Sequence, residues 1–380
     1  MSKRIGRRTF VKGATSAFLG LATAPLVSAA HSSAKKSTNQ AVEYRILGKT
    51  GLKVTVVGMG VMNCNDPAVL LRAFDLGVNF YDTARIYMHG RNEVMVGKVF
   101  GGKRDKVLIQ TKVVLTSSNK KNRENVEKSL KSLRTDYVDV LLAHSLNSPG
   151  QVCKPATIEF LQAMKKEGKA RFTGFSAHSN MASLLKAAVK GGCHDVALVS
   201  YNFTHSKKLK EAIALAAKAG IGVVAMKTQA GGYKAARMRG LNPHQAALKY
   251  VVMDRNVSTA VPGVTTIEPI DQCVAVMGRA FSRSDADSLE QYDSYLQGRI
   301  CTMCGDCRGD CPYGVDHTDL LRVVMYHDGY NNDDLVAEAL QESGLLEKSK
   351  QCAECSSCSI TCRRGLDIRA HMDLVKRIMA

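Results

Sequence analysis

The chain contains, near its C-terminal end, the stretch Cys301-Thr-Met-Cys304-Gly-Asp-Cys307-Arg-Gly-Asp-Cys311-Pro312. The same spacing returns downstream in the stretch Cys352-Ala-Glu-Cys355-Ser-Ser-Cys358-Ser-Ile-Thr-Cys362. Both stretches read C-x2-C-x2-C-x3-C, and a proline follows the fourth cysteine of the first. Three thiolates on one tight loop can bind three irons of a cubane cluster, whereas the fourth thiolate lies beyond that loop. The repeated spacing therefore predicts two iron–sulfur clusters.

In bacterial ferredoxins with this spacing, the fourth cysteine of each run binds the cluster of the other run. We therefore assign one [4Fe–4S] cluster to Cys301, Cys304, Cys307 and Cys362. The second [4Fe–4S] cluster is assigned to Cys352, Cys355, Cys358 and Cys311. Zinc sites and disulfides are the alternatives. Zinc usually binds two well-separated C-x2-C pairs, and disulfides would not favour a duplicated spacing.

Residues 1–30 are predicted to be a signal peptide that is absent from the mature protein. They contain Arg7-Arg8-Thr-Phe-Val-Lys12, which resembles a twin-arginine export signal, and then a moderately apolar run over residues 14–27. That run is too short and too rich in Ala, Gly and Thr to be a stable membrane anchor. Val27-Ser28-Ala29 offers small residues for a signal peptidase. A chance basic amphipathic start is the alternative.

Residues 31–41 are polar and rich in Ser and Lys, which predicts a flexible tether. The twin-arginine pathway exports proteins that are already folded. Because clusters need reduced thiolates to assemble, they would be inserted in the cytoplasm and carried across intact. We therefore expect a periplasmic or otherwise exported protein, with no transmembrane anchor after signal cleavage.

The composition describes a globular protein with an excess of basic residues. Hydrophobic residues make up 45% of the chain, which excludes disordered and membrane-spanning classes, and the formal net charge is +19. No basic run is interleaved with aromatic residues, so a nucleic-acid partner is not expected. The charge favours an acidic redox partner or an anionic substrate, with solubility as an equally simple explanation.

Apolar runs of strand length alternate with amphipathic runs of helix length eight times within residues 42–285. The predicted strands cover residues 54–60, 78–83, 107–113, 138–144, 170–176, 196–201, 222–227 and 257–262. The predicted helices include residues 66–76, 123–133, 158–167, 181–190, 207–219 and 244–253. Eight βα units whose strands are apolar on both faces predict an α/β fold, the (β/α)8 TIM barrel. A doubly wound open sheet is the alternative, but Gly58-Met-Gly60-Val-Met lacks the third glycine of its phosphate loop.

The pattern changes in the last part of the chain, residues 286–380. A linker helix is predicted near residues 286–297, two or three helices over residues 318–348 between the cysteine runs, and a closing helix over residues 371–379. Together with the cysteine spacing, this pattern predicts a small ferredoxin-like domain with a helical insertion.

Four polar residues follow consecutive barrel strands, at the ends where barrel active sites lie: Asp82, Tyr87, Lys112 and His144. A tyrosine is a poor acid at neutral pH, but an adjacent lysine ammonium makes it more acidic, and an aspartate keeps that lysine charged and oriented. A histidine can share a proton or orient a carbonyl group. Each residue alone could be a helix cap, a surface lysine or a core histidine, but the four together predict a proton-transfer site.

Over residues 42–279 the chain resembles an aldo/keto reductase. The matching segments are residues 48–60, Asp82-Thr-Ala-Arg-Ile-Tyr87, Lys112, Asp139-Val-Leu-Leu-Ala-His144, Gly174-Phe-Ser176 and Val261-Pro-Gly263. With the cysteine runs added, the chain is similar to the branch of that family that is fused to a ferredoxin-like domain. The resemblance implies that Tyr87 is the general acid, tuned by Lys112, Asp82 and His144. It also implies cofactor contacts at Ser176, Gly263, Thr265 and Thr266.

The nicotinamide side of the site departs from the family. Ala177 stands where the family usually has Asn, Leu198 where it has Gln, and Met226 where an aromatic residue stacks on the nicotinamide. The segment after the eighth strand offers a helix N-terminus for a phosphate, but no Lys or Arg for the 2′-phosphate of NADP. Two clusters are therefore expected as cofactors, while NADP(H) stays an open alternative.

Other cysteines and histidines lie near the barrel. Cys64, His89, His178 and His205 could line a substrate pocket or bind a metal ion with His144, although scattered loop histidines usually do neither. The thiols of Cys153, Cys193 and Cys273 are interpreted as ordinary buried or surface groups.

Three functions remain open from the sequence. The first is an exported iron–sulfur oxidoreductase that acts on a carbonyl or alcohol group of a small molecule and exchanges electrons with a protein partner. The second is an NADP(H)-dependent reductase exported with its cofactor trapped, and the third is an electron-transfer module with an idle barrel. A hydride carries two electrons whereas a cluster exchanges one, so nicotinamide would need an intermediary such as a flavin, for which no motif is visible.

Overall fold

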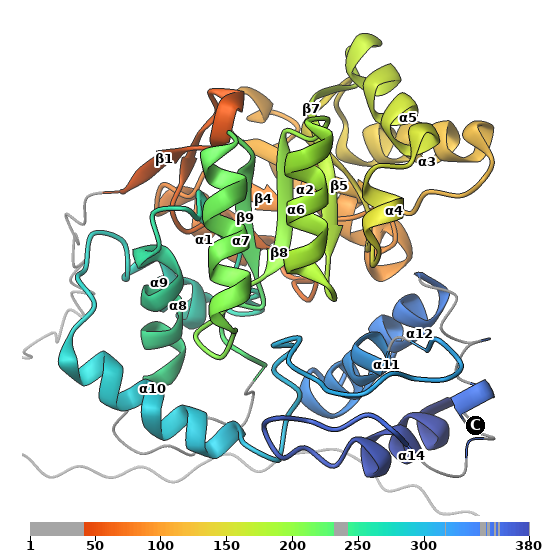
Figure 1. Ribbon diagram of the computed structural model, residues 1–380. Coiled ribbons are helices and arrows are strands. Elements are labelled where there is room, and N and C mark those ends of the chain that lie inside the picture. The colour runs from red at the N-terminus through yellow and green to blue at the C-terminus, as the bar shows by residue number, and fades with distance from the viewer. Residues whose placement is uncertain are drawn as a thin grey trace, which may run out of the picture. The chain divides into compact units, whose positions relative to one another are not determined.

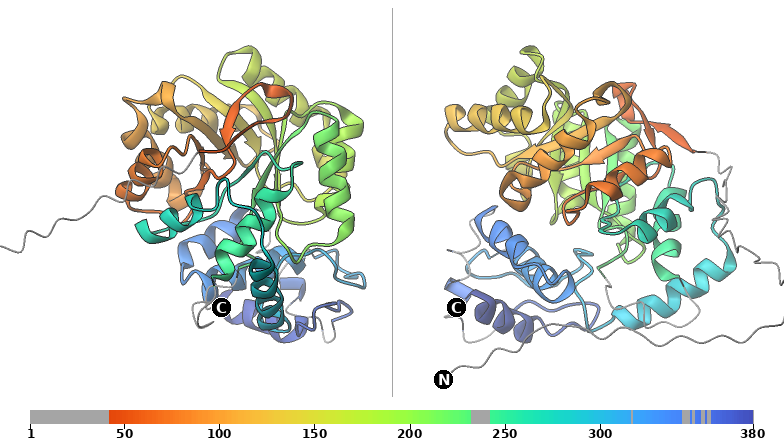
Figure 2. Two further views of the ribbon diagram at one scale, coloured as in Figure 1. Left: turned by 90° about the vertical axis from the view of Figure 1, so that its left-hand side faces the viewer. Right: turned by 180° about the vertical axis from the view of Figure 1, so that it is seen from behind.

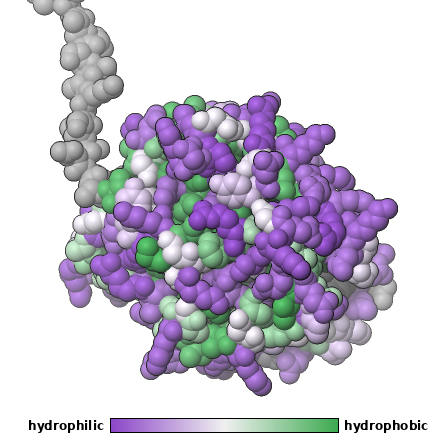
Figure 3. Space-filling view, turned by 90° about the horizontal axis from the view of Figure 1, so that it is seen from above, coloured by the Kyte–Doolittle hydropathy of each residue, from purple (hydrophilic) through white to green (hydrophobic). Residues whose placement is uncertain are grey.

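The structure is a computed structural model that describes residues 42–231, 242–315, 317–342, 347, 350–352, 355 and 358–379. The predicted signal peptide and tether lie outside the described residues. Within the described part of the chain, no helix combines the length and the apolar character that a membrane span requires. Hydrophilic side chains cover most of the face shown in Figure 3, with hydrophobic ones scattered among them.

Eight parallel strands form the centre of the molecule (Figure 1). In chain order they are β3 (Met59–Gly60), β4 (Phe80–Asp82), β5 (Leu108–Val113), β6 (Val138–Ala143), β7 (Ala170–Ala177), β8 (Val196–Ser200), β9 (Gly222–Met226) and β10 (Thr259–Ala260). Each strand pairs with the next in parallel, and bridges from Val57 to Ala260 and from Gly60 to Gly263 join the last strand to the first. The sheet is therefore closed, and the predicted (β/α)8 barrel is confirmed.

The closing seam depends on a glycine. A Cβ atom at Gly60 would lie 2.9 Å from the carbonyl oxygen of Val261, closer than real Cβ contacts allow. The amide of Gly60 donates to the carbonyl of Pro262 over 3.0 Å, and the amide of Gly58 donates to that of Ala260 over 2.8 Å. The strands can approach closely enough for these hydrogen bonds only because no side chain stands between them.

Helices surround the sheet: α1 (Pro67–Asp75), α2 (Arg91–Phe100), α3 (Asn119–Leu133), α4 (Pro149–Val152), α5 (Pro155–Lys166), α6 (Met181–Gly191), α7 (Lys207–Lys218), α8 (Pro243–Met253) and α9 (Ile267–Val274). All six helices predicted in this region are present, with boundaries shifted by a few residues. The sequence pattern does not single out α2, which contains Gly97. A Cβ atom at Gly97 would lie 2.3 Å from the carbonyl oxygen of Ser132 in α3. The glycine therefore lets α2 pack closely against α3.

Before the barrel, β1 (Tyr44–Ile46) and β2 (Lys53–Thr55) form an antiparallel hairpin. Its neighbouring residues Leu47 and Leu52 pack in one apolar cluster with alternate residues of the strands, such as Leu142 and Leu198. A Cβ atom at Gly222, the first residue of β9, would lie 2.7 Å from Leu47, so the hairpin covers the amino ends of the strands. The opposite end, where the carboxyl ends of the strands meet, remains for the site.

The C-terminal region contains α10 (Arg283–Leu296), α11 (His317–Val324), the π-helical turn η5 (Met325–Gly329), α12 (Asp333–Glu342) and α14 (Ile368–Met379). Helix α10 packs against α8, and the ammonium of Lys249 lies 2.9 Å from the carboxylate of Asp285. Helices α11, α12 and α14 lie side by side (Figures 1 and 2). Reciprocal backbone hydrogen bonds of 2.9 Å between Arg308 and Thr361 join the two cysteine runs. The predicted helices between and after the runs are thus present.

Candidate active site

The structure brings the four predicted proton-transfer residues together at the carboxyl ends of β4, β5 and β6. The ammonium of Lys112 donates to Asp82 Oδ2 over 2.9 Å and to the Tyr87 hydroxyl over 3.2 Å. The rings of Tyr87 and His144 meet edge to face, with centroids 5.9 Å apart. None of the four side chains is more than 8% exposed. In this arrangement a cation stabilises any negative charge that develops on the phenol oxygen, and low solvent exposure strengthens that effect.

Neighbouring groups hold Asp82 and Lys112 in place. The side-chain amide of Gln110 donates to Asp82 Oδ1 over 2.7 Å, and Lys112 also donates to the carbonyl of Thr83 over 2.7 Å. Both oxygens of Asp82 therefore accept a hydrogen bond from strand β5. A buried ion pair needs such additional hydrogen bonds to offset its lost hydration. Gln110 is not among the predicted site residues, although its position two residues before Lys112 places it on the same face of the strand.

The segment that carries Tyr87 has an unusual backbone. Met88 and His89 have φ angles of 52° and 53°, in the left-handed region. The guanidinium of Arg85 lies under Gly90, where a Cβ atom would be 1.5 Å from it. Arg85 donates to the buried carboxylate of Glu93 over 2.6 Å. Burial raises the pKa of Glu93, whereas Arg85 and the hydroxyl of Thr111 oppose that rise. This buried pair supports the turn from which Tyr87 projects.

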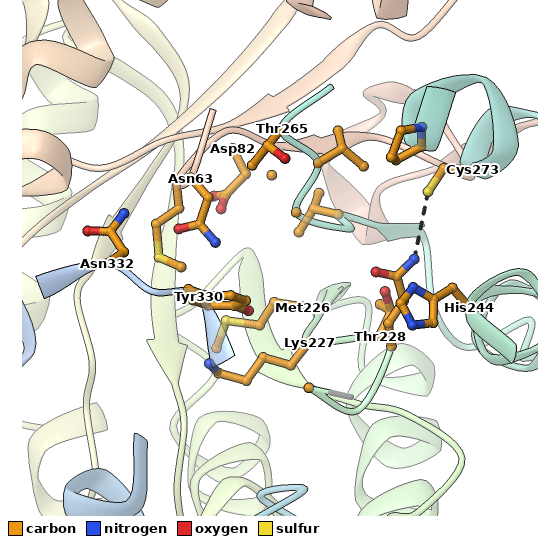
Figure 4. Close-up of a pocket in the computed structure, with 18 of the residues that line it drawn as sticks. Asn63, Asp82, Met226, Lys227, Thr228, His244, Thr265, Cys273, Tyr330 and Asn332 are labelled. Carbon is orange, nitrogen blue, oxygen red and sulfur yellow. Dashed lines mark hydrogen bonds between the residues drawn. The ribbon is translucent and has the colours of Figure 1, made fainter. Parts of the chain in front are cut away.

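A cavity of about 430 Å³ opens beside Asp82 and Tyr87. In Figure 4, Asn63 and Asp82 lie across it from Met226 and Lys227, and Cys273 and His244 lie at one end. The predicted cofactor residues Gly263 and Thr265 line this cavity. Ser176 and Thr266 are not among its lining residues: the Ser176 hydroxyl accepts from the Ser145 amide over 2.9 Å, and Thr266 is the N-cap residue of α9.

The described lining residues of the cavity carry few basic groups. Lys227 is the only lysine or arginine among the lining residues that the structure describes. The first turn of α9, where a phosphate would be expected, contains Glu268 and no basic residue. Among the described residues the hydroxyl of Thr228 is buried without a hydrogen-bond partner, and it lines the cavity, so it offers one polar contact to a ligand.

The structure brings cysteines of the two runs near one another. Cys301, Cys304, Cys307 and Cys362 surround one small cavity. Burial first, and then the thiols of Cys307, Cys304 and Cys362, raise the pKa of Cys301 to about 12. Burial likewise raises the pKa of Cys352, and Cys358, Cys311 and Cys355 add to that rise. Each run thus meets the fourth cysteine of the other run, and the eight thiols fit two clusters whose iron would replace the thiol protons.

The other candidate ligands are dispersed. His178 lines the same small cavity as Tyr87 and His144, whereas the side chain of His89 is 54% exposed. His205 is partly buried, its Nδ1 accepts from the Asn202 amide over 3.1 Å, and desolvation lowers its pKa to about 4. Cys64 is buried beneath the loops. Within the described ranges, no three His, Cys, Asp or Glu residues are grouped as ligands of a single metal ion.

Residues from the C-terminal region also line the two cavities beside Tyr87, and no pattern in the sequence predicts this. A small cavity beside Tyr87 and His144 is bounded by Arg322 of α11, Tyr326 of η5 and Glu338 of α12. The amide of His89 donates to Glu338 Oε1 over 3.1 Å, which fixes α12 against the segment that carries Tyr87. Tyr326 lines the larger cavity as well. The sequence shows that Arg322 is a charged residue between apolar residues of α11. It does not show that Arg322 lies near Tyr87.

Comparison with known proteins identifies both regions. Residues 64–235 match the model of the aldo/keto reductase family, and residues 299–367 match that of the 4Fe-4S dicluster domain. Over 305 residues the chain is 27% identical to L-galactose dehydrogenase of Arabidopsis thaliana, an alignment that covers 67% of this chain and 95% of the relative.

Solved structures share the fold. An aldo-keto reductase from Bacillus halodurans in its holo form has a TM-score of 0.57 at 24% identity, covering 66% of this chain and 96% of that one. An aldo-keto reductase from Klebsiella pneumoniae in complex with NADPH has a TM-score of 0.55 at 24% identity, covering 66% and 95%. This chain is therefore an oxidoreductase that carries an aldo/keto reductase domain followed by a 4Fe-4S dicluster domain.

Proposed function

We propose that this chain is an exported iron–sulfur oxidoreductase that interconverts a carbonyl and an alcohol group of a small molecule at the barrel. The electrons would be exchanged with a redox protein through two [4Fe–4S] clusters. The single observation that carries the proposal is the buried series of hydrogen bonds from Asp82 through Lys112 to Tyr87, at 2.9 Å and 3.2 Å. A phenol held beside a buried ammonium is equipped to give and take a proton, which carbonyl reduction and alcohol oxidation both require.

The proton moves between Tyr87 and the substrate oxygen. In the reductive direction the Tyr87 hydroxyl gives its proton to the carbonyl oxygen, and Lys112 stabilises the phenolate that remains. In the oxidative direction the phenolate accepts the hydroxyl proton of the substrate. Asp82 keeps Lys112 charged, while His144 offers a second hydrogen-bonding group in the same cavity. General acid–base catalysis of this kind contributes about 100-fold to 10,000-fold to the rate.

The clusters, when bound, would supply one-electron transfer between the barrel and a protein partner. The arrangement of the described residues supports this role. Tyr326, which lines both cavities, belongs to one apolar cluster with Met303 and Met325, against which the cluster ligand Cys301 packs. The same group of packed side chains therefore contacts both Cys301 and the cavities beside Tyr87. The formal charge is +19 for the whole chain and 19 − 5 = +14 without the five basic residues of the proposed signal peptide, and this excess favours an acidic partner.

Export is part of the proposal and is supported by the Arg7-Arg8 motif and the apolar run behind it. Replacing Arg7→Lys together with Arg8→Lys should leave the protein in the cytoplasm with an uncleaved signal. Cell fractionation followed by immunoblotting measures both the compartment and the size. Normal export of the double variant would show that another route is used.

The nature of the cofactors is tested by anaerobic purification of the full chain. The protein should contain about eight irons and eight acid-labile sulfides, and it should have broad visible absorbance. Mass spectrometry of the molecules released by heat should detect no stoichiometric nicotinamide. Stoichiometric zinc without visible absorbance would overturn the cluster assignment.

A second function, an NADP(H)-dependent reductase exported with its cofactor trapped, is favoured by one observation. The cavity of about 430 Å³ lies beside Tyr87 and is lined by Gly263 and Thr265, the position expected for a nicotinamide cofactor. Release of stoichiometric NADP(H) on heating would favour this function over the first. The relative that acts on L-galactose makes sugars the first compounds to assay. L-galactose oxidation coupled to ferricyanide or to NADP distinguishes the two electron acceptors.

A further inference from the structure

Four of the twelve cysteines lie outside the two cysteine runs: Cys64, Cys153, Cys193 and Cys273. Cys64 and Cys273 are buried in the core of the barrel, with exposed fractions of 0% and 3%. Cys153 and Cys193 are only half-buried. Cys153 is the C-cap residue of α4, and Cys193 follows the C-cap residue of α6. No pattern in the sequence pairs these two thiols, so their arrangement is a result of the fold.

The fold brings the thiols of Cys153 and Cys193 to one place. Helices α4 and α6 pack against each other, and the Cys153 thiol donates to the carbonyl of Ala187 in α6 over 3.4 Å. A Cβ atom added to Gly191, the last residue of α6, would lie 3.1 Å from the Sγ of Cys153 and 3.4 Å from the Sγ of Cys193. Both sulfurs therefore border the same small space, which the glycine leaves open.

The backbone segments that carry the two thiols are also joined beside them. The Nε2 of His194 lies 2.9 Å from the carbonyl oxygen of Val152. His194 directly follows Cys193, and Val152 directly precedes Cys153. A disulfide requires two backbones that lie close together, with Cα atoms less than about 7 Å apart. A contact one residue away from each cysteine favours that approach.

The chemistry of the pair suits a lasting bridge better than catalysis. Burial first, and then the neighbouring Cys153, raise the pKa of Cys193. A thiol with a raised pKa is mostly protonated at neutral pH, so it is not an activated nucleophile. It is also a poor leaving group in thiol–disulfide exchange, so a bridge made from it resists attack by other thiols. Gly191 and Gly192 are exposed, so an oxidant can approach from solvent.

We propose that Cys153 and Cys193 are a modification site, at which a disulfide joins the end of α4 to the end of α6. The oxidant is a protein disulfide, of the kind that oxidises thiols in an export compartment. One cysteine attacks this disulfide and releases one thiol of the oxidant, and the other cysteine then displaces the second. One Sγ–Sγ bond replaces two S–H bonds, and the two electrons and two protons remain on the two thiols of the oxidant.

The bridge would close a loop of residues 153–193, which contains α5, β7 and α6. Such a cross-link restricts the unfolded chain and so stabilises the folded barrel. This role is independent of the reaction at Tyr87. The formation of the bridge in the cell rests on the proposed export, whereas the ability of the two thiols to form it does not.

The deciding experiment uses the full chain with its clusters, purified anaerobically and equilibrated with oxidised and reduced glutathione. Acid precipitation then drives off the cluster sulfide and stops thiol exchange, because only thiolates react. Free thiols are alkylated with N-ethylmaleimide, and the proteolytic peptides are identified by mass spectrometry. Wild type should give two peptides joined through Cys153 and Cys193, two hydrogen atoms lighter than the separate peptides.

The matched variants Cys153→Ser and Cys193→Ser should give no joined peptides, and each remaining cysteine should be alkylated or bound to glutathione. Alkylated thiols or separate glutathione adducts at both positions of wild type would overturn the inference. The visible absorbance of the clusters, recorded before acid treatment, shows that each protein is intact.

Thermal unfolding measures the stabilising role on one protein in two redox states. The bridged wild type should unfold at a temperature about 5 °C or more above that of the same protein reduced with dithiothreitol. The double variant Cys153→Ala with Cys193→Ala should unfold at one temperature in both conditions. Equal unfolding temperatures for the two states of wild type would overturn the stabilising role.

The outcome for the bridge can be separated from the outcome for the proposed function. Joined peptides in exported wild type, and alkylated thiols in the Arg7→Lys, Arg8→Lys variant, would place the oxidation after export. A bridge that forms with glutathione but is absent from the exported protein would overturn its formation in the cell. A Tyr87→Phe protein that turns over as wild type would remove the proposed function and leave the bridge untouched.

Discussion

The barrel and the dicluster region keep their functional side chains in place by different means. In the barrel, Asp82, Lys112 and His144 lie at the ends of strands whose backbone hydrogen bonds form a closed sheet, and two apolar clusters pack inside and outside that sheet. In the dicluster region, the cysteines are themselves part of the packing. A core of nine buried apolar residues is surrounded by six of the eight cluster cysteines.

The functional residues of the barrel can therefore be removed without removing its fold, whereas the cysteines of the dicluster region are part of the core that folds it. Removing one proton-transfer residue from the barrel leaves the sheet and its apolar core in place. Removing the iron from the dicluster region removes the centre around which its small core is arranged, because small domains bury too little apolar surface to fold unaided.

Removal of iron by a chelator should unfold the dicluster region and leave the barrel folded. Hydrogen exchange followed by mass spectrometry should show lost protection over residues 299–379 and retained protection in the barrel strands. The physical reason is that metal binding is part of the folding free energy of such domains. Simultaneous loss of protection in both regions would mean that the barrel depends on the clusters too, and retained protection in both would mean that apolar packing suffices.

Replacing Cys311→Ser should damage the cluster bound by Cys352, Cys355 and Cys358, because the structure groups Cys311 with them. The cluster bound by Cys301, Cys304 and Cys307 should remain. Electron paramagnetic resonance of the reduced protein distinguishes the two clusters, and Cys362→Ser provides the reciprocal variant. Damage confined to the cluster of its own run would refute the crossed assignment.

Lys112→Met should destabilise the barrel by about 3–5 kcal/mol, because it leaves the carboxylate of Asp82 buried without its cation. Urea unfolding monitored by circular dichroism measures the change. Arg72→Met is the matched control, since its ion pair with Asp271 is 42% and 40% exposed, and its loss should cost no more than about 1 kcal/mol. Activity of Lys112→Met should fall, with its optimum at higher pH. Equal destabilisation by both variants would contradict the buried-pair interpretation.

Tyr87→Phe should reduce turnover by about 100-fold to 10,000-fold while leaving the free energy of unfolding within about 1 kcal/mol of wild type. Only one hydroxyl is lost, and the ring continues to pack against His144. Turnover with an artificial one-electron acceptor, together with urea unfolding, measures both effects. Tyr44→Phe, on the hairpin at the other end of the barrel, should change neither. A fully active Tyr87→Phe protein would leave the barrel without its proton donor.

The smallest effect concerns His194, which is buried beside Phe175 and whose Nε2 lies 2.9 Å from the carbonyl of Val152. Burial lowers the pKa of His194, so the folded protein keeps the ring neutral while the unfolded chain binds a proton below about pH 6.5. Stability should therefore fall as the pH decreases from 7 to 5, by at most about 2 kcal/mol for one proton. His194→Gln should weaken this dependence in thermal unfolding. An identical pH dependence in the variant would assign it to other groups.

Much of this protein could be predicted from local patterns in its chain. The alternation of apolar strands and amphipathic helices predicts the barrel because burial on both sides of a parallel sheet leaves a periodic trace in the sequence. The position of Lys112 two residues after Gln110, and of His144 at the end of its strand, places these side chains because strand geometry is regular. The repeated cysteine spacing likewise predicts a cluster site, because three of the four ligands of a cluster lie within one short loop.

Tertiary structure alone decided the contacts between elements that lie far apart in the chain. Arg322, Tyr326 and Glu338 lie beside Tyr87 because α11, η5 and α12 pack over the mouth of the barrel. The periodicity of a helix does not predict which surface the helix will cover, because that depends on the shapes and charges of the helix and of the surface. Gly60 and Gly97 also reflect tertiary structure. Each leaves room for the backbone of a segment that lies far away in the sequence and packs against it only in the folded protein. Local patterns in the chain therefore predict the barrel, the two cysteine runs and the position of Tyr87 after a barrel strand, whereas packing decides which residues cover Tyr87.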